Sequence, residues 1–157
     1  MPKMSSRLKK GTIAGALAVS LIGGFEGLRQ NAYPDPATGG KPWTICYGHT
    51  VGVKPGDHKS IEECKALLLA DLAEYAGGIE ACTTVPLPDT RLIALTSFAV
   101  NVGVTAACGS SVIRLINQGR TREGCNALLK WNKAAGIVSP GLTKRRQREQ
   151  AFCLEGL

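Results

Sequence analysis

Two carboxylates with different surroundings lie within the stretch Gly24 to Thr50. Glu26 directly follows an uncharged apolar run, so we expect its carboxyl to be partly desolvated, which favours the protonated form that a general acid needs. Asp35 lies in a turn between two prolines, where it should stay solvated and ionised. Glycosidic hydrolysis requires such a pair, because one carboxyl protonates the leaving oxygen while the other assists water or stabilises the oxocarbenium-like transition state.

The residues around this pair are similar to the active-site segment of the phage-type lysozymes, the endolysins of glycoside hydrolase family 24. Glu26 stands in EGLR, Asp35 follows nine positions later, and Thr44 begins TICYGHT. The resemblance implies that Glu26 is the general acid, Asp35 the second carboxylate, and Thr44 the hydroxyl that helps to place the attacking water. It continues through ECKALL, SFAVNVG and GLTKRRQRE, and so extends along nearly the whole chain.

The family resemblance implies a fold and an activity. The fold would be lysozyme-like, with a small β-hairpin lobe joined by a long helix to a helical lobe. The activity would be that of an N-acetylmuramidase, which hydrolyses the β-1,4 bond between N-acetylmuramic acid and N-acetylglucosamine in peptidoglycan with inversion. Neither a metal nor another cofactor is expected.

The turn between Asp35 and Thr44 departs from the family pattern. The segment PATGGKP makes this gap three residues longer than the usual spacing, so a gapless alignment would place Thr38 at the position of the hydroxyl. We favour Thr44 because Gly48 and His49 follow it in the family order, and the extra residues fit a longer hairpin turn.

The resemblance also predicts residues that support the site. His49 is expected to form an ion pair with Asp71 on the long helix, which would hold the hairpin lobe in place. Arg145 or Arg146 on the last helix either belongs to a solvated basic face or reaches toward the acid Glu26. Asn101 is expected to be a hydrogen-bonding core residue that faces the cleft.

Secondary-structure signals predict an α+β protein in which helices dominate. Ser60 and Glu63 form a capping box at the start of a long helix, and Asp89 and Thr121 are expected to cap two later helices. Strands are expected only between Tyr33 and Val53. The predicted helices cover residues 61–79, 90–103, 112–119, 122–134 and 142–157.

The N-terminal residues have the layout of an export signal. Residues 1–10 carry four basic side chains and no acid, and residues 11–25 carry no charge. A fifteen-residue helix spans roughly 22 Å, short of a hydrocarbon core of about 30 Å. We therefore expect residues 1–25 to form a weak, uncleaved signal-anchor and residues 26–157 the catalytic domain. A cleaved signal peptide and an ordinary buried helix remain the alternatives.

This arrangement resembles the signal-anchor-release subgroup of endolysins, in which host export machinery inserts the anchor and its later release activates the enzyme. The anchor, residues 11–25, would lie in the host inner membrane with the N-terminus in the cytoplasm. Its last residue, Phe25, directly precedes Glu26. Release into the periplasm of a Gram-negative host would then let the helix that carries Glu26 pack beside Asp35 and Thr44.

The six cysteines suit up to three disulfides in an oxidising compartment. The alternative is six buried free thiols in a cytosolic protein. We expect Cys125 to pair with Cys153, because this disulfide would tie the last two helices together. Pairing among the other four is left open; these are Cys46, Cys64, Cys82 and Cys108.

The net charge of +7 favours an anionic partner such as a cell-wall polymer. Nucleic acid is not expected, because the basic residues are split between the N-terminus and the last helix without a recognition motif. Two other functions remain open: a lytic transglycosylase, which would use the acid alone, and a non-catalytic, membrane-tethered wall-binding protein. A monomer is expected.

Overall fold

The computed structural model describes residues 3–36 and 39–157. It is mostly helical with two small antiparallel sheets, which confirms the predicted α+β class. The chain forms two compact units. The hairpin unit is Leu8–Leu72, and the helical unit combines the N-terminal segment up to Arg7 with Ala73–Leu157.

The apolar run near the N-terminus forms helix α1, Ile13–Glu26. Thr12 caps its start, since its hydroxyl oxygen accepts a hydrogen bond from the Gly15 amide at 3.0 Å. One set of α1 residues, including Leu21 and Ile22, is fully buried. Among the described residues, no helix combines the length and the apolar character needed to cross a membrane.

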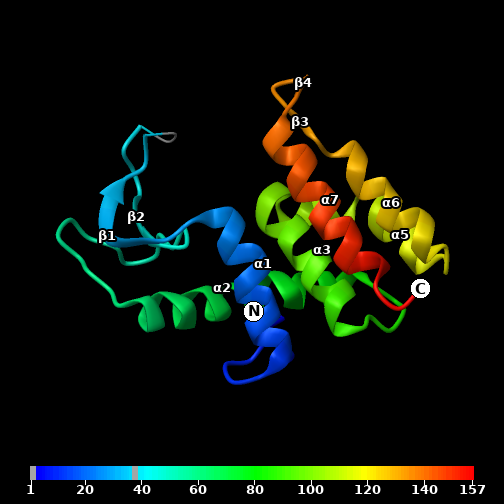
Figure 1. Ribbon diagram of the computed structural model, residues 1–157, viewed down its shortest axis with the longest axis horizontal. Coiled ribbons are helices and arrows are strands. Elements are labelled where there is room, and N and C mark those ends of the chain that lie inside the picture. Colours follow the sequence, from blue (N-terminus) through cyan, green and yellow to red (C-terminus); the bar gives the residue numbers. More distant parts are fainter. Residues whose placement is uncertain (1–2, 37–38) are drawn as a thin grey trace. The chain divides into compact units, whose positions relative to one another are not determined.

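A β hairpin follows α1 in the hairpin unit (Figure 1). Strands β1, Arg29–Pro34, and β2, Trp43–Cys46, pair antiparallel with an irregularity between Arg29 and Tyr33. The expectation that strands begin at Tyr33 was therefore wrong at this end, because β1 starts four residues earlier. Ile45 and Cys46 of β2 form a small buried core with Cys64.

Helix α2, Ile61–Cys82, begins in the hairpin unit and continues into the helical unit. The predicted capping box is confirmed. The Glu63 amide donates to the Ser60 hydroxyl at 3.1 Å, and the Ser60 amide donates to the Glu63 carboxylate at 3.0 Å. Two orphan donors at the start of the helix are satisfied in this way.

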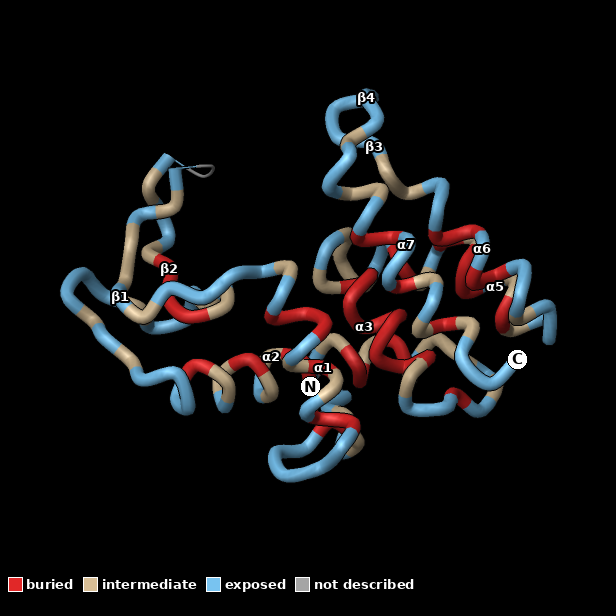
Figure 2. The backbone as a smooth tube through the Cα atoms, viewed as in Figure 1, coloured by how far each residue is buried: buried red, intermediate tan, exposed pale blue. Residues whose placement is uncertain are grey.

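The helical unit is built around α3, Asp89–Val102, in which every residue from Arg91 to Ala99 is buried (Figure 2). A helix that is buried on all sides occupies the centre of a core. Helix α3 packs against α7, Pro140–Leu154. The elements between them are α4 Val104–Cys108, α5 Ser111–Asn117, α6 Thr121–Ala127, the 3-10 helix η2 Leu128–Lys130, and strands β3 Lys133–Ala134 and β4 Ile137–Val138.

Several sequence-based boundaries in the helical unit are corrected by the structure. The helix expected over residues 122–134 ends at Ala127, and the 3-10 helix η2 follows it. Strands β3 and β4 then form a short hairpin, so the expectation that strands occur only between Tyr33 and Val53 was wrong. Asp89 makes no capping hydrogen bond and instead lies in the first turn of α3. Thr121 is likewise the first residue of α6 rather than its cap. The helix predicted over residues 142–157 starts two residues earlier, at Pro140, because Ser139 caps it and Pro140 fits the first helical position.

Three disulfides use all six cysteines. Cys125 bonds to Cys153, which is the pair favoured from the sequence. This bond joins α6 to α7 within the helical unit. The other two pairs, which the sequence left open, are Cys46–Cys64 and Cys82–Cys108.

Candidate active site

Glu26 is the last residue of α1, and its side chain is exposed. The helix stops there because Gly27 has a φ of 75°, which is not helical. The turn after β2 borders this carboxylate: a Cβ built on Gly48 would lie 3.9 Å from Glu26 Oε2. Gly48 has a φ of 86°, a conformation that glycine adopts without strain. The structure thus places the YGH turn beside the predicted acid.

Asp35 and Thr44 are brought together by the pairing of the hairpin strands. Pro34 at the end of β1 lies opposite Trp43 at the start of β2. Asp35 directly follows the first of these residues, and Thr44 directly follows the second. Both predicted residues are therefore adjacent to the last pair of the ladder: Asp35 lies on its turn side, and Thr44 lies on the other side, where it pairs with Tyr33. Asp35 is half-buried, so solvent still reaches it.

Thr44 is 4% exposed and lies on β2. Its hydroxyl donates to the Pro42 carbonyl at 3.3 Å, and this leaves the lone pairs of its oxygen able to accept a hydrogen bond from water. The alternative hydroxyl, Thr38, lies outside the described residues.

The hairpin is fixed to α2 by a disulfide and by a polar pair. Cys46, two residues after Thr44, bonds to Cys64, and both side chains are buried. His49 Nδ1 lies 2.9 Å from Asp71 Oδ2, the pair expected from the resemblance. The other ring nitrogen lies 3.1 Å from the Val51 carbonyl, so both nitrogens face acceptors. Each therefore makes its hydrogen bond only when it carries a proton.

The remaining predicted residues lie in the helical unit. Arg145 and Arg146 are buried, whereas Asn101, which was expected in the core, is exposed. Arg146 is fully buried, and its guanidinium donates to Asn101 Oδ1 at 2.8 Å. Its Nε also lies 2.8 Å from Glu149 Oε1. Arg145 donates to the Ser97 carbonyl at 3.0 Å and lies 3.3 Å from Glu149 Oε2. The expectation that Arg145 or Arg146 reaches toward Glu26 stays a prediction.

Glu149 and Ser97 were missed by the sequence reasoning. Both are fully buried, and the Ser97 hydroxyl donates to Glu149 Oε2 at 2.5 Å. Burial raises the pKa of Glu149, while the nearby charge of Arg146 opposes this rise. Burial likewise lowers the pKa of Arg146. A usable signal was present, because Glu149 follows Arg146 and Arg145 at the three- and four-residue spacings that place side chains on one helix face.

A hollow of about 770 Å³ lies in the hairpin unit between α1 and the first half of α2. Its lining is mostly apolar and includes Val19, Tyr47 and Leu69, with Lys10 and Lys65 among its charged residues. It includes none of the three predicted site residues, so we do not assign it to the chemistry. In the part of the chain that is described, no three His, Cys, Asp or Glu side chains are grouped as metal ligands.

Comparison with known proteins gives a consistent result. A family profile described as phage lysozyme matches residues 23–149. The SAR-endolysin of Pseudomonas phage phiKMV is 39% identical over 97% of this chain and 94% of its own length. The endolysin of Bacillus phage B103 is also 39% identical, over 88% of this chain, although the match spans only 52% of that protein.

Solved structures of the P1 phage endolysin Lyz match in two forms. The structure titled as its active form has a TM-score of 0.77 and 29% identity, and the match covers 92% of this chain and 85% of that one. The structure titled as its secreted inactive form has a TM-score of 0.50 and 26% identity, with 68% and 76% covered. The match to the active form thus has the higher TM-score and covers more of both chains.

Proposed function

Because this chain belongs to the phage lysozyme family, we propose that it is a phage endolysin, a muramidase that hydrolyses peptidoglycan and so lyses the host cell. The match to the phiKMV SAR-endolysin over almost the full length of both proteins carries this assignment. The substrate is the β-1,4 bond between N-acetylmuramic acid and N-acetylglucosamine. The product would be a reducing end with inverted configuration.

The hairpin unit supplies the proposed chemistry. Glu26, exposed at the end of α1, donates a proton to the glycosidic oxygen. Asp35 stabilises positive charge on the sugar ring or assists the attacking water. The Thr44 oxygen accepts a hydrogen bond from this water and orients it. The disulfide between Cys46 and Cys64 supports this role, because it fixes β2 to α2 two residues from Thr44.

Membrane release of residues 11–25 is the proposed control of this activity. In the exported precursor these residues would lie in the inner membrane, and Glu26 would be held at its periplasmic surface. After release, the same residues form α1 and bury one face in protein instead of lipid. The greater similarity to the active form of P1 Lyz supports the view that this conformation is the released one.

Product analysis tests the reaction. Purified peptidoglycan digested with the full chain should give fragments with reducing ends, detected by mass spectrometry. Fragments with 1,6-anhydro ends would instead identify a lytic transglycosylase. Clearing that persists in Glu26→Gln would contradict the assignment of the acid, and a wild-type protein that binds walls without cleaving them would identify a wall-binding protein.

A mass measurement tests the anchor. We expect the intact mass in both the membrane and the periplasmic fractions of cells that express the chain. A periplasmic protein that lacks residues 1–24 would show that a signal peptide is cleaved, and the release proposal would then be wrong.

A further inference from the structure

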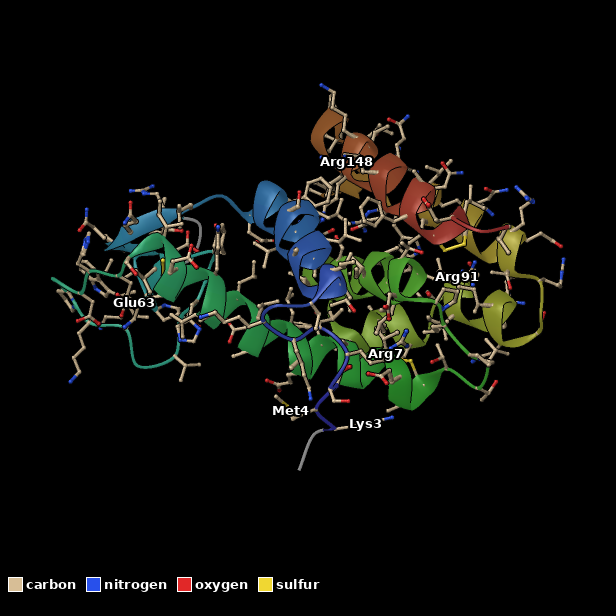
Figure 3. All side chains as sticks on the ribbon, turned by 60° about the horizontal axis from the view of Figure 1, so that its bottom comes forward. Lys3, Met4, Arg7, Glu63, Arg91 and Arg148 are labelled. Carbon is tan, nitrogen blue, oxygen red and sulfur yellow. A yellow bond between two sulfur atoms is a disulfide. The ribbon has the colours of Figure 1, made fainter. Side chains whose placement is uncertain are left out.

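The first described residues of the chain are held against α2 and α3 in the helical unit. We call residues 3–7 the strap. The Ser5 amide donates to the Ala73 carbonyl at 2.9 Å. Arg7 donates to Asp89 Oδ1 at 2.6 Å and to the Leu87 carbonyl at 2.7 Å. Figure 3 shows Lys3, Met4 and Arg7 along this segment. The strap thus has a defined place on the helical unit, although the next residue, Leu8, belongs to the other unit.

A glycine in α2 makes room for the backbone of the strap. A Cβ built on Gly77 would lie 1.8 Å from the Lys3 carbonyl oxygen and 3.1 Å from Met4 Cα. No side chain fits there while the strap is docked. Glycine in the interior of a helix is unfavourable relative to alanine, so this position needs a reason. The close approach of the strap supplies one.

The strap and its docking surface carry opposite charges. A hollow of about 180 Å³ is lined by Lys3 and Arg7 from the strap and by Glu80 from α2. Asp89 on α3 adds a second carboxylate, which pairs with Arg7. The docking surface therefore complements a basic segment in charge as well as in shape.

We propose that the strap is a latch that keeps the released enzyme from re-entering the membrane, an inference that rests on the membrane-release function proposed above. While residues 11–25 lie in the membrane, the strap is in the cytoplasm and its docking surface is in the periplasm. Its contacts with Ala73 and Asp89 can form only after the whole N-terminus has crossed the membrane. The latch is therefore specific to the released state.

The latch makes release harder to reverse. Lys3 and Arg7 leave water or anionic lipid headgroups when they cross the membrane, and the passage of charge through a bilayer is costly. On the periplasmic side, Arg7 gains a carboxylate and a carbonyl as partners. Arg7 lies only six residues before the start of α1 at Ile13. A docked strap therefore keeps the start of α1 on the periplasmic side. Re-entry of α1 into lipid in its original orientation first requires the strap to detach.

Amide hydrogen exchange of the purified full chain tests the latch directly. In the wild type, the Ser5 amide should be protected by its hydrogen bond to Ala73. In Gly77→Ala the added methyl group excludes the strap, and we expect Ser5 to exchange at least ~10-fold faster. Gly141→Ala is the matched control, because a Cβ there would meet only Ser139 Oγ at 3.8 Å. This control should leave Ser5 exchange unchanged.

Asp89→Asn gives a second variant that keeps the backbone contacts. It weakens a partly exposed ion pair, so we expect Ser5 exchange to rise by about 2- to 5-fold. In cells, both variants should leave more intact protein in the membrane fraction than the wild type and the Gly141→Ala control do. A Ser5 amide that is unprotected in the wild type, or equal membrane fractions in all four proteins, would overturn the latch.

Failure of the latch and failure of the proposed function give different results. Ser5 exchange is measured on the purified chain and does not depend on catalysis. The same sample assayed on purified peptidoglycan tests the muramidase activity, which Gly77→Ala should keep at the wild-type level. Loss of glycan cleavage in the wild type would reject the enzyme assignment, whereas normal cleavage with unprotected Ser5 would reject only the latch.

Discussion

In the hairpin unit the carboxylates predicted to act on substrate are accessible, whereas the largest fully buried side chain of the helical unit is itself charged. Glu26 is exposed and Asp35 is half-buried. Arg146 and Glu149, in contrast, are both 0% exposed. The comparison separates two uses of charge. The carboxylates of the hairpin unit are accessible to a glycan, whereas the buried charges of the helical unit contact protein groups instead of water.

Burial explains why the charges of the second set lie next to one another, although Arg146 Nε and Nη1 and Glu149 Oε1 make no hydrogen bond within the described residues. A charge that leaves water loses several kcal/mol of hydration, so buried ions persist only beside groups that compensate for this loss. Glu149 has Ser97, Arg145 and Arg146 around it, and Arg146 also donates to Asn101. Arg146 lies over the Phe98 ring as well, with 5.1 Å from Cζ to the centroid. These contacts define the core between α3 and α7.

A Glu→Gln substitution should therefore reduce activity in the hairpin unit and stability in the helical unit. Glu26→Gln removes the proton donor, and we expect turbidity-clearing activity to fall by at least ~10²-fold with an unchanged melting temperature. Glu149→Gln leaves two buried guanidinium groups without their carboxylate, and we expect a loss of about 3–5 kcal/mol in the free energy of unfolding. Urea unfolding and cell-wall clearing of both variants measure these effects.

The matched control is Glu155→Gln, at an exposed position just after α7, which should change neither property. A large stability loss in Glu26→Gln, or a stable Glu149→Gln that has lost activity, would reverse the assignment of these carboxylates.

The disulfides extend the comparison to covalent bonds. Replacing Cys46 and Cys64 by serine removes a disulfide between residues 18 positions apart. We expect the free energy of unfolding to fall by about 3 kcal/mol. Replacing Cys125 and Cys153 by serine removes a disulfide between residues 28 positions apart, and the free energy of unfolding should fall by a similar amount. Only the first bond lies beside Thr44. We therefore expect the first variant to lose activity even at temperatures where it is folded, and the second to keep it.

Thermal melts with activity assays at a temperature well below each midpoint separate the two effects. Equal specific activity of the folded fractions would show that the hairpin does not need its disulfide to position Thr44.

Much of the hairpin unit could be predicted because its signals are local. The Ser60 and Glu63 spacing located the start of α2, and the order of Glu26, Asp35 and Thr44 matched a family segment. Their placement at the hairpin followed from the turn between them. The start of β1 at Arg29 was missed, because the irregular pairing before Tyr33 interrupts the alternation of a strand.

The helical unit was harder to predict because its important contacts join distant residues. Ser97 and Glu149 are 52 positions apart, and the helix spacing that relates Glu149 to Arg145 and Arg146 does not show that these groups are buried. Basic residues near the end of a chain usually indicate a solvated face, yet α7 buries Arg145 and Arg146. The strap was missed for the same reason, since the role of Gly77 depends on the backbone at Lys3.

A smaller effect is expected from the pair that holds the hairpin to α2. Asp71→Asn removes the charge that faces His49, and because Asp71 is 39% exposed we expect a loss of only about 0.5–1 kcal/mol. Glu62→Gln is the control, since that carboxylate is 74% exposed and lies 3.6 Å from Lys65. Urea unfolding should show a smaller change in this control. A loss above about 3 kcal/mol in Asp71→Asn would place the pair with the buried network instead.

The smallest effect concerns the start of α2 and its dependence on pH. Hydrogen bonds from the Ser60 amide and hydroxyl lower the pKa of Glu63 below its ordinary value of 4.5. The unfolded chain therefore takes up this proton at a higher pH than the folded chain does. The stabilisation by the capping box is complete above pH 4.5 and is lost as the pH falls through the lowered pKa.

Amide exchange in the first turn of α2 measures this loss. Local protection should decrease with acid in the wild type, whereas Glu63→Gln should have weaker protection at neutral pH and little further change. Protection in the wild type that increases with acid would mean that folding raises the pKa of Glu63 instead of lowering it. Cys64, the residue after Glu63, forms the disulfide to β2. Loss of protection in the first turn of α2 would therefore also show how far the hairpin depends on its attachment to α2.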